Sequence, residues 1–481
     1  EAMETYNAKM NLHFSGVLLS AIKWAKPDFI DRTKTNIMAG RANIIGGVFA
    51  EHIMPYFTGE VNAKSVELNN EILEEILGLQ SVPKVFWIPE RVCRGNTFND
   101  VINNVRLGTL TGYTSTVIDQ ITHFKKWFPS DNNVNKLHKI NGVICFLIND
   151  DADQKKFWNE DEGLHTETRR QLLAKAMDSD QEQLVLVFDD WEAYAGRSFT
   201  SALPNDNADN WEKTVRWIAN HQWIEMVTLE EILNKNWTVT DHGNNTSLQL
   251  QTYEWLMHAT EDNYDNWYNG TGQEDSFKDA VPLLRGDRYG TKTLLPNNKK
   301  YGDINTAGTI LYDVWQYIKN SPDNELKKTA EYAYEAMIYE TAWHDEDMND
   351  YIPKNLDGTW KYPDTTKDNI SNWALYLHGH IRHAAVTAAA ARWADEVKTG
   401  IKNSSTVTET VDVDFDGENE YVLKNNKVFA VFENDGGRLI MAFAYDSVKG
   451  GIQVIGNPIS NYSFEGEEEG EKKSSGFRDI F

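Results

Sequence analysis

The most constraining feature of this sequence is a short apolar run that ends in a cluster of carboxylates and aromatic rings. Residues Leu184–Phe188 are all apolar, and Asp189, Asp190, Trp191 and Glu192 follow at once. A continuous apolar run of this length is typical of a strand covered on both faces, as in a parallel sheet. In barrels of alternating strands and helices, chemistry takes place where the strands end. The run therefore predicts a buried strand with a reactive carboxyl end.

A second stretch of the same form lies earlier in the chain. The apolar residues Val85–Ile88 lead into Glu90 and Arg91. Two carboxylates at strand ends on one rim can serve as nucleophile and acid/base in glycosidic cleavage, so Glu90 and Asp190 are candidates for these roles. Arg91 can hold Glu90 ionised, while neighbouring acids and apolar rings can raise the pKa of Asp190. The structural alternative is an ion pair between Glu90 and Arg91, with Asp190 as a helix N-cap.

Strand patterns alternate with helical patterns over the first half of the chain. The expected strands are Met10–Gly16, Ala42–Phe49, Val85–Ile88, Thr111–Ile118, Gly142–Leu147 and Leu184–Phe188, with Trp223–Thr228 as a further edge. An amphipathic helix is expected over Asn62–Leu79. Repeated alternation means a parallel sheet, and a closed or nearly closed barrel places all the strand ends on one rim. We therefore predict an α/β barrel domain over residues 1–240.

The patterns change twice after residue 240. Helical periodicity is found over Gln251–Met257, Ala307–Lys319, Asp323–Thr341 and Ser371–Val397. A helical bundle with rim loops is therefore predicted over residues 241–402. From residue 403 the apolar pattern has a period of two, with expected strands at Thr406–Val413, Glu420–Lys424, Lys427–Glu433, Leu439–Tyr445 and Gly451–Gly456. This period predicts a β-sandwich-like domain over residues 403–481.

Composition limits the partners of this chain. The formal net charge is −26 over 481 residues, which argues against nucleic acid and anionic membranes as partners and fits a neutral or cationic substrate. No run of apolar residues is long enough to span a membrane. Aromatic residues make up 12% of the chain, and rings beside carboxylates suit sugar faces, although most rings are expected in the core. Two cysteines exclude a disulfide framework, and both are expected to be small buried hydrophobes.

Several motifs together resemble glycoside hydrolase family 57. Asp190–Gly196 resembles the general-acid motif of that family, and Phe86–Val92 resembles its nucleophile motif. Further resemblances are found in Asn43–His52, which is similar to the motif after an earlier strand, in Glu340–Asp345, which is similar to the aromatic-histidine motif of the bundle, and in Asp412–Phe432, which is similar to the opening of the β-domain in amylase-like and amylopullulanase-like members. The combination in this order is far more specific than any single motif.

The resemblance implies a retaining glycosidase that cleaves α-linked glucans such as starch, maltooligosaccharides or pullulan. Glu90 is then the nucleophile and Asp190 the acid/base. The substrate-binding residues that it implies are His52, Trp87, Asp119, His123, Trp191, Glu192, Trp343, His344 and Asp345. The implied fold is an incomplete (β/α)7 barrel, because the chain starts at what looks like the second strand of the family and lacks the sugar-binding His motif of the first. The C-terminal β-domain is likewise expected to be truncated.

Other functions fit parts of the same pattern. A 4-α-glucanotransferase would share the glycosyl-enzyme and differ only in whether water or a sugar hydroxyl resolves it. A metal-dependent polysaccharide deacetylase or mannosidase would use Asp189 and Asp190 with His ligands on Zn²⁺, and a non-catalytic carbohydrate-binding relative would keep only the aromatic residues. The substrate is a polysaccharide or oligosaccharide in each case. Asn-x-Ser/Thr triplets lean slightly toward export, and the oligomeric state is left open.

The β-domain opens with an acidic repeat. Asp412, Asp414, Asp416 and Gly417 repeat the start of a calcium loop, but the twelfth position is Leu423 and the flanks are strands. We expect no cofactor for catalysis. A structural calcium held by Asp412, Asp414, Asp416 and Glu420 is a hypothesis, and the alternative is an acidic β-turn.

Overall fold

The chain is described by a computed structural model that divides into two compact units. The described residues are 2–52, 54, 57–98, 113–149, 172–178, 180, 182–188, 206–249, 251, 307–308, 310–338, 372–415, 417, 419–434 and 437–456, with backbone only at 206–210 and 372–380. Unit 1 comprises Glu1–Pro55 and Gly59–Trp255, and unit 2 comprises Tyr56–Thr58 and Leu256–Phe481.

Unit 1 is organised around consecutive parallel strands. The strands are β1 (Met10–His13), β2 (Ala42–Ile45), β3 (Val85–Phe86), β4 (Ser115–Asp119) and β6 (Val143–Ile148). β1 pairs with β2, β3 with β4, and β4 with β6, all in parallel. A parallel bridge between Gly46 and Phe86 joins the segment after β2 to β3, and another between Ile148 and Leu186 extends the series beyond β6. Their carboxyl ends therefore lie along one edge, as a barrel rim requires.

The central strands are buried on both faces. Val85, Val117 and Phe146 belong to one hydrophobic cluster, whereas the adjacent residues Phe86 and Ile118 belong to another. Because side chains alternate across a strand, each strand contributes one face to each of the two hydrophobic clusters. This explains why the sequence shows continuous apolar runs there rather than an alternation of polar and apolar residues.

Helices cover the strands and begin at recognisable signals. α2 (Gly16–Ala25) begins after Ser15, whose Oγ accepts a hydrogen bond from the amide N–H of Leu18 at 3.3 Å. α3 (Pro27–Met38) starts at a proline, which suits the first turn. α4 (Gly59–Leu77) buries one face, including Val61, Leu68, Leu73 and Ile76. This helix confirms the amphipathic pattern predicted for residues 62–79.

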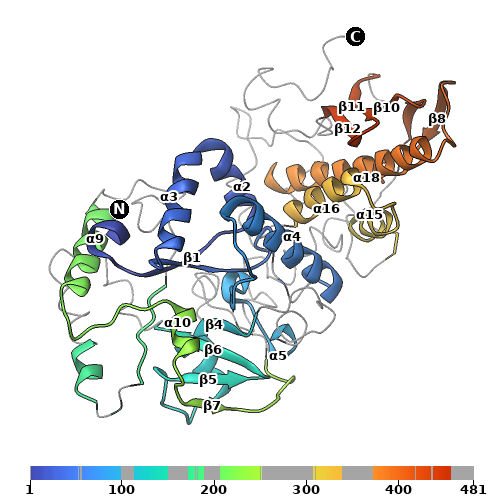
Figure 1. Ribbon diagram of the computed structural model, residues 1–481. Coiled ribbons are helices and arrows are strands. Elements are labelled where there is room, and N and C mark those ends of the chain that lie inside the picture. The colour runs from blue at the N-terminus through green and yellow to red at the C-terminus, as the bar shows by residue number, and fades with distance from the viewer. Residues whose placement is uncertain are drawn as a thin grey trace, which may run out of the picture. The chain divides into compact units, whose positions relative to one another are not determined.

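A β-hairpin that the apolar pattern did not predict extends the sheet. β5 (Leu137–Ile140) runs antiparallel to β6 and parallel to β7 (Val239–Asp241), so the five-stranded order is β3-β4-β6-β5-β7. Figure 1 shows β4, β6, β5 and β7 side by side. Asn141 and Gly142 both have positive φ, as a two-residue hairpin turn requires. The Asn-Gly dipeptide was the sequence signal for this turn.

Two of the predicted strands of unit 1 differ from the structure. The prediction of an edge strand over Trp223–Thr228 is wrong, because the amide of Ile224 bonds to the carbonyl of His221 in a turn and Thr228 caps the helix α10 (Leu229–Asn234). Leu184–Phe188 runs beside β6 but forms only an isolated bridge at Leu186. The other elements among the described residues of unit 1 are α1 (Ala2–Tyr6), η2 (Pro89–Arg91), α5 (Gly95–Thr97), η5 (Gln120–Phe124), α6 (Lys125–Trp127) and α9 (Asp206–Ala219).

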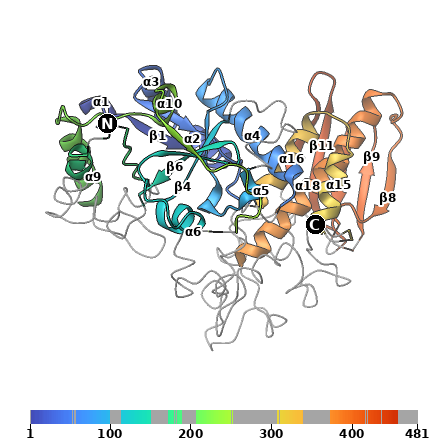
Figure 2. The same cartoon turned by 90° about the horizontal axis from the view of Figure 1, so that it is seen from below.

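The described residues of unit 2 form three helices and an antiparallel sheet. The helices are α15 (Ile310–Lys319), α16 (Glu325–Met337) and α18 (Asn372–Lys398), and the strands are β8 (Val407–Val411), β9 (Glu420–Lys424), β10 (Val428–Phe432), β11 (Leu439–Asp446) and β12 (Gly450–Gly456). The sheet order is β12-β11-β10-β9-β8. Figure 2 shows α18 running beside this sheet. Buried alanines and Trp393 of α18 share one hydrophobic cluster with Phe429 and Phe443. The strand positions confirm the period-two pattern.

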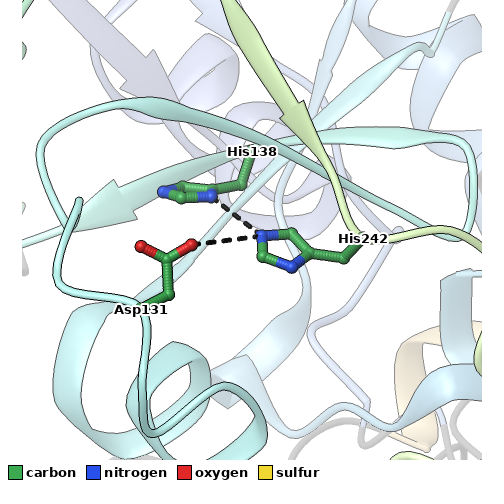
Figure 3. A group of neighbouring side chains, drawn as sticks. All are labelled: Asp131, His138 and His242. Carbon is green, nitrogen blue, oxygen red and sulfur yellow. Dashed lines mark hydrogen bonds and ion pairs between the residues drawn. The ribbon is translucent and has the colours of Figure 1, made fainter.

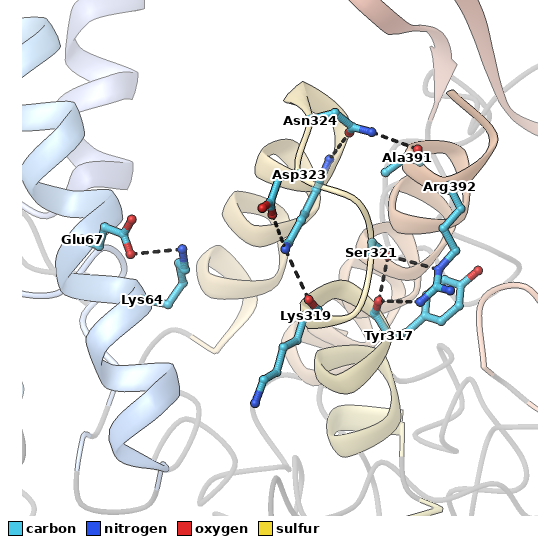
Figure 4. Close-up of polar contacts among 10 residues, drawn as sticks. Lys64, Glu67, Tyr317, Lys319, Ser321, Asp323, Asn324, Ala391 and Arg392 are labelled. Carbon is cyan, nitrogen blue, oxygen red and sulfur yellow. Dashed lines mark hydrogen bonds and ion pairs between the residues drawn. The ribbon is translucent and has the colours of Figure 1, made fainter. Parts of the chain in front are cut away.

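Polar contacts fix the helices of unit 2 against one another (Figure 4). The Asn324 side chain caps α16 by accepting from the amide of Lys327 at 3.0 Å, and its amide group donates to the Ala391 carbonyl at 2.9 Å. The Arg392 guanidinium lies 4.1 Å from the ring centroid of Tyr317 and donates to its carbonyl. One helix cap thus also joins α16 to α18. Within the described part of the chain, no helix combines the length and apolar character needed to cross a bilayer.

Candidate active site

Glu90 lies on strained backbone just beyond the carboxyl end of β3. Its φ is 50° and its ψ is 13°, and Arg91 also has a positive φ of 53°. Left-handed backbone costs a non-glycine residue about 1–3 kcal/mol, so the surrounding structure must hold this turn in place. Glu51, beyond the end of the neighbouring strand β2, is left-handed as well. Such strain is concentrated at functional sites, which makes the half-buried Glu90 the leading candidate for a reactive group.

Arg91, the residue after Glu90, forms a buried charged group with Asp119 and His123, which we name the barrel cluster. Nε of Arg91 lies 3.2 Å from Oδ2 of Asp119, the last residue of β4. Nδ1 of His123 lies 3.0 Å from the same oxygen, and its Nε2 donates to the Arg91 carbonyl at 2.6 Å. Asp119 therefore binds the side chain of Arg91 and His123 binds its backbone carbonyl, directly next to Glu90 in the chain.

The contacts of His123 favour its charged form. Nε2 faces the Arg91 carbonyl oxygen and Nδ1 faces an Asp119 carboxylate oxygen, and both oxygens are acceptors. Nδ1 also lies 3.2 Å from the backbone N–H of Asp119, a donor that favours the neutral ring. Burial alone disfavours the charged ring, but Cys93 and the Asp119 carboxylate outweigh burial and raise the pKa of His123 to about 10. The cluster then holds two cations on one carboxylate, which suits a position next to another anionic group such as Glu90.

An aromatic stack connects the β3 end with the segment that leads to Asp190. The rings of Trp87 and Phe188 stack at 4.4 Å between centroids with an interplanar angle of 17°. The Arg91 guanidinium carbon lies 5.6 Å and 5.9 Å from the same two ring centroids. Trp87 precedes Glu90 by three residues, and Phe188 precedes Asp190 by two. The apolar stretches Val85–Ile88 and Leu184–Phe188 are therefore in contact through these two rings.

Two histidines follow the first two strands, His13 as the last residue of β1 and His52 in the segment between β2 and α4. His52 is fully buried, its Nε2 lies 2.7 Å from the Asn62 side-chain oxygen, and burial lowers its pKa to about 4. His13, at the end of β1, has Nε2 2.9 Å from Oε1 of Glu51. His52 is thus neutral near neutral pH. Its predicted contact with sugar stays a prediction.

Several predicted site residues lie outside the described residues. These are Asp190, Trp191, Glu192, Trp343, His344, Asp345 and Asp416. Of the described ones, Trp87, Asp119 and His123 all contact Arg91, the residue after Glu90 at the end of β3. His52 contacts Asn62 instead. Sequence reasoning missed Phe188 as a contact of Trp87 and the pairing of Arg91 with Asp119. Neither pair has a signal in the sequence, because the partners meet only through the sheet.

Unit 2 contains a second buried charged group, the sheet cluster, made of Arg382, Asp414 and Glu433. The Arg382 side chain of α18 donates from Nε to Oδ2 of Asp414 at 2.5 Å, and its Nη2 lies 3.4 Å from Oε1 of Glu433. Asp414 also belongs to an acidic group with Asp412 and Glu420, in which one carboxylate oxygen of each residue lies within 4.8 Å of the other two. This spacing is compatible with a calcium ion, although Arg382 already neutralises part of the charge. The calcium site stays a prediction.

The described parallel strands of unit 1 end along one edge, and β4 ends there in the carboxylate of Asp119. Comparisons with known proteins then place the chain in a family. The model of glycosyl hydrolase family 57 matches residues 1–244, so the chain belongs to this family. It is similar to Alpha-amylase 1 of Dictyoglomus thermophilum, with 20% identity over 374 residues that cover 72% of this chain and 48% of the relative. The chain thus spans about half the length of this curated relative.

A solved structure shares the fold. The crystal structure of 4-alpha-glucanotransferase from Thermococcus litoralis matches with a TM-score of 0.51 and 16% sequence identity. The match covers 92% of this chain and 61% of that one. At this identity the likeness concerns the fold alone.

Proposed function

We propose that this chain cleaves α-linked glucans with retention of configuration, through a covalent glycosyl-enzyme on Glu90. One observation carries the proposal: the stack of Trp87 on Phe188 joins the segments that lead to Glu90 and Asp190. Membership of a glycosyl hydrolase family supports it, as does the similarity to a protein named Alpha-amylase 1. Retaining glycosidases hold their two carboxyl groups about 5–5.5 Å apart, a spacing that strand ends on one rim can provide.

The proposed reaction has two steps. A Glu90 oxygen attacks the anomeric carbon while the glycosidic C–O bond breaks, and Asp190 gives its proton to the leaving sugar oxygen. Asp190 then takes a proton from water, whose oxygen attacks the anomeric carbon and releases Glu90. If a sugar hydroxyl replaces water, the same intermediate gives transfer instead of hydrolysis.

The barrel cluster is proposed to position Glu90 and keep it ionised. Arg91 and the charged His123 favour the anionic form of nearby carboxylates, and the pinned Arg91 carbonyl fixes the left-handed turn. Asp119 orients both cations and is a positioning residue in this account. His52, Trp87, Trp191, Glu192, Trp343, His344 and Asp345 are proposed to surround the bound sugar.

Substitution of the proposed nucleophile tests the function. Glu90→Gln should lower reducing-sugar release from soluble starch by roughly 10³-fold or more, because no covalent intermediate can form. Binding of maltooligosaccharides, measured by calorimetry, should be kept. Glu74→Gln, on the exposed side of α4, is the matched control and should keep full activity. Unchanged activity in Glu90→Gln would contradict the proposal.

Resolution of the products by size separates the alternatives. Shorter maltooligosaccharides alone mean hydrolysis, whereas a ladder that extends in both directions means transfer. Binding without any change in chain length would favour the carbohydrate-binding alternative. Activity that is lost on chelation and restored by zinc would favour a metal-dependent deacetylase or mannosidase.

A further inference from the structure

We propose that Asp131, His138 and His242 form a binding site for a divalent transition-metal ion, best suited to zinc. Figure 3 shows the three side chains converging from separate segments of unit 1. Asp131 lies in the loop after α6, His138 lies on β5, and His242 directly follows β7. One ligand atom from each residue lies within 4.8 Å of the other two.

The distances between these atoms are close to those of a metal site. Nδ1 of His138 and Nε2 of His242 are 3.0 Å apart, and Nε2 of His242 is 3.8 Å from Oδ2 of Asp131. Ligand bonds of about 2.0–2.1 Å at a tetrahedral zinc place ligand atoms roughly 3.3 Å apart. Only small side-chain movements are therefore needed for all three atoms to reach one ion.

Asn133 orients two of the three ligands. Its carbonyl lies 2.9 Å from Nε2 of His138, so that nitrogen carries the proton and Nδ1 turns its lone pair into the cluster. Its amide donates to Oδ1 of Asp131 at 2.9 Å, which leaves Oδ2 facing the histidines. A backbone carbonyl on the far nitrogen of a histidine is the usual outer-shell arrangement around a bound metal.

The surroundings of the cluster are partly apolar and favour a rigid site. Phe128 stacks on His242 at 4.0 Å, and Phe124 lies 4.1 Å from His138, between centroids. Lys125 holds the loop through the carbonyls of Pro129 and Asp131. Neutral imidazoles in a partly apolar shell are competent zinc ligands.

The donor set selects the kind of ion. Two imidazoles and one carboxylate suit zinc and its neighbours in the first transition series, whereas calcium and magnesium prefer oxygen ligands alone. Three protein ligands leave a fourth position for water. Because the ion would join His138 to a residue more than a hundred positions later, it would act as a clip between the hairpin, β7 and the loop after α6.

Zinc titration of the chelator-stripped protein tests this site. Titration calorimetry with zinc chloride, in calcium-containing buffer that fills carboxylate clusters, should show one site per chain that is lost in the variants. Asp131→Asn and His242→Ala should each weaken zinc binding at least roughly 10-fold, since outer-shell changes alone cost 10- to 100-fold. His221→Ala removes a histidine outside the cluster and should bind zinc like the parent chain.

Thermal melting provides a second readout. Zinc at roughly 100-fold above its Kd should raise the melting temperature of the parent chain by about 5 °C or more, and should not raise that of His242→Ala. Circular dichroism of the stripped variants checks that they fold, and Asp131→Asn replaces His242→Ala if the latter does not. Equal zinc affinity in the parent chain and both variants, or no zinc binding at all, would overturn the proposal.

Discussion

The barrel cluster and the sheet cluster bury the same pair of chemical groups in different settings. Each pairs an arginine guanidinium with an aspartate carboxylate that is almost fully buried. In unit 1 the arginine itself lies on left-handed backbone, next to Glu90 at a strand end. In unit 2 Arg382 reaches from α18 to the turn between β8 and β9. A buried ion pair alone therefore does not indicate whether its role is catalytic or structural. The backbone conformation around the pair is needed to distinguish the two.

The largest expected effect is the loss of stability when the sheet cluster is broken. Asp414→Asn leaves the Arg382 guanidinium buried against an uncharged amide, which should lower the free energy of unfolding by about 3–5 kcal/mol. Activity per folded molecule should not change. Chemical denaturation combined with glucan-cleavage assays measures both quantities. Glu433→Gln, which removes the longer 3.4 Å contact, should cost less than about 1 kcal/mol.

The second effect is a loss of activity after a conservative substitution in the barrel cluster. Arg91→Lys keeps the charge but loses the planar guanidinium that lies over Trp87 and reaches Asp119. We expect kcat to fall by roughly 10- to 100-fold, with a stability loss of about 1–2 kcal/mol. Arg94→Lys, an exposed arginine on the same loop, is the control and should keep kcat within about twofold. If Arg91→Lys lowered the stability but left kcat unchanged, the barrel cluster would have only a structural role, like the sheet cluster.

The third prediction uses pH, because only the barrel cluster contains a titrating imidazole. The pKa of His123 is raised from 6.5 to about 10, so its contribution is fully present below pH 6.5 and is lost as the pH rises toward 10. The stability difference between the parent chain and His123→Gln should therefore shrink over this range. The cost of Asp414→Asn should stay constant. Cys93→Ser, which keeps His123, checks the contribution of the neighbouring thiol.

The smallest expected effect concerns calcium at the sheet cluster. If Asp412, Asp414 and Glu420 hold an ion, chelation should lower the melting temperature by about 2–4 °C, and Asp412→Asn should abolish this response. The effect is limited because Arg382 already compensates Asp414. Glu409→Gln, a partly exposed acid on β8, is the control. If a calorimetric titration shows no calcium binding, the acidic residues form only a β-turn.

Much of the fold follows from sequence because its signals are local. The buried runs at β3 and β6, the helix α4 and the period-two strands β9 to β12 each carry their pattern within a few residues. The failures have local causes too. Trp223–Thr228 has strand-like alternation, but its backbone groups serve a turn and a helix cap, and the hairpin at Asn141 was hidden in a mostly polar stretch.

The site was predictable only as separate pieces. Glu90 could be chosen because it follows an apolar strand, whereas Asp119 and His123 were named through the resemblance to the family. Their mutual contacts depend on the register of β3 with β4, which single-strand patterns do not encode. The convergence of Asp131, His138 and His242 likewise depends on the pairing of β5 with β7. Chemistry-bearing residues are visible in sequence, whereas the pairs they form are properties of the sheet.

The most direct test of this account is to trap the glycosyl-enzyme. A fluorinated maltosyl donor with a good leaving group forms the intermediate faster than it is released, so the adduct can be located by mass spectrometry of peptides. The account predicts one maltosyl adduct per chain, on Glu90, and none in Glu90→Gln. An adduct on another residue, or turnover of the donor with inversion and no adduct, would contradict it.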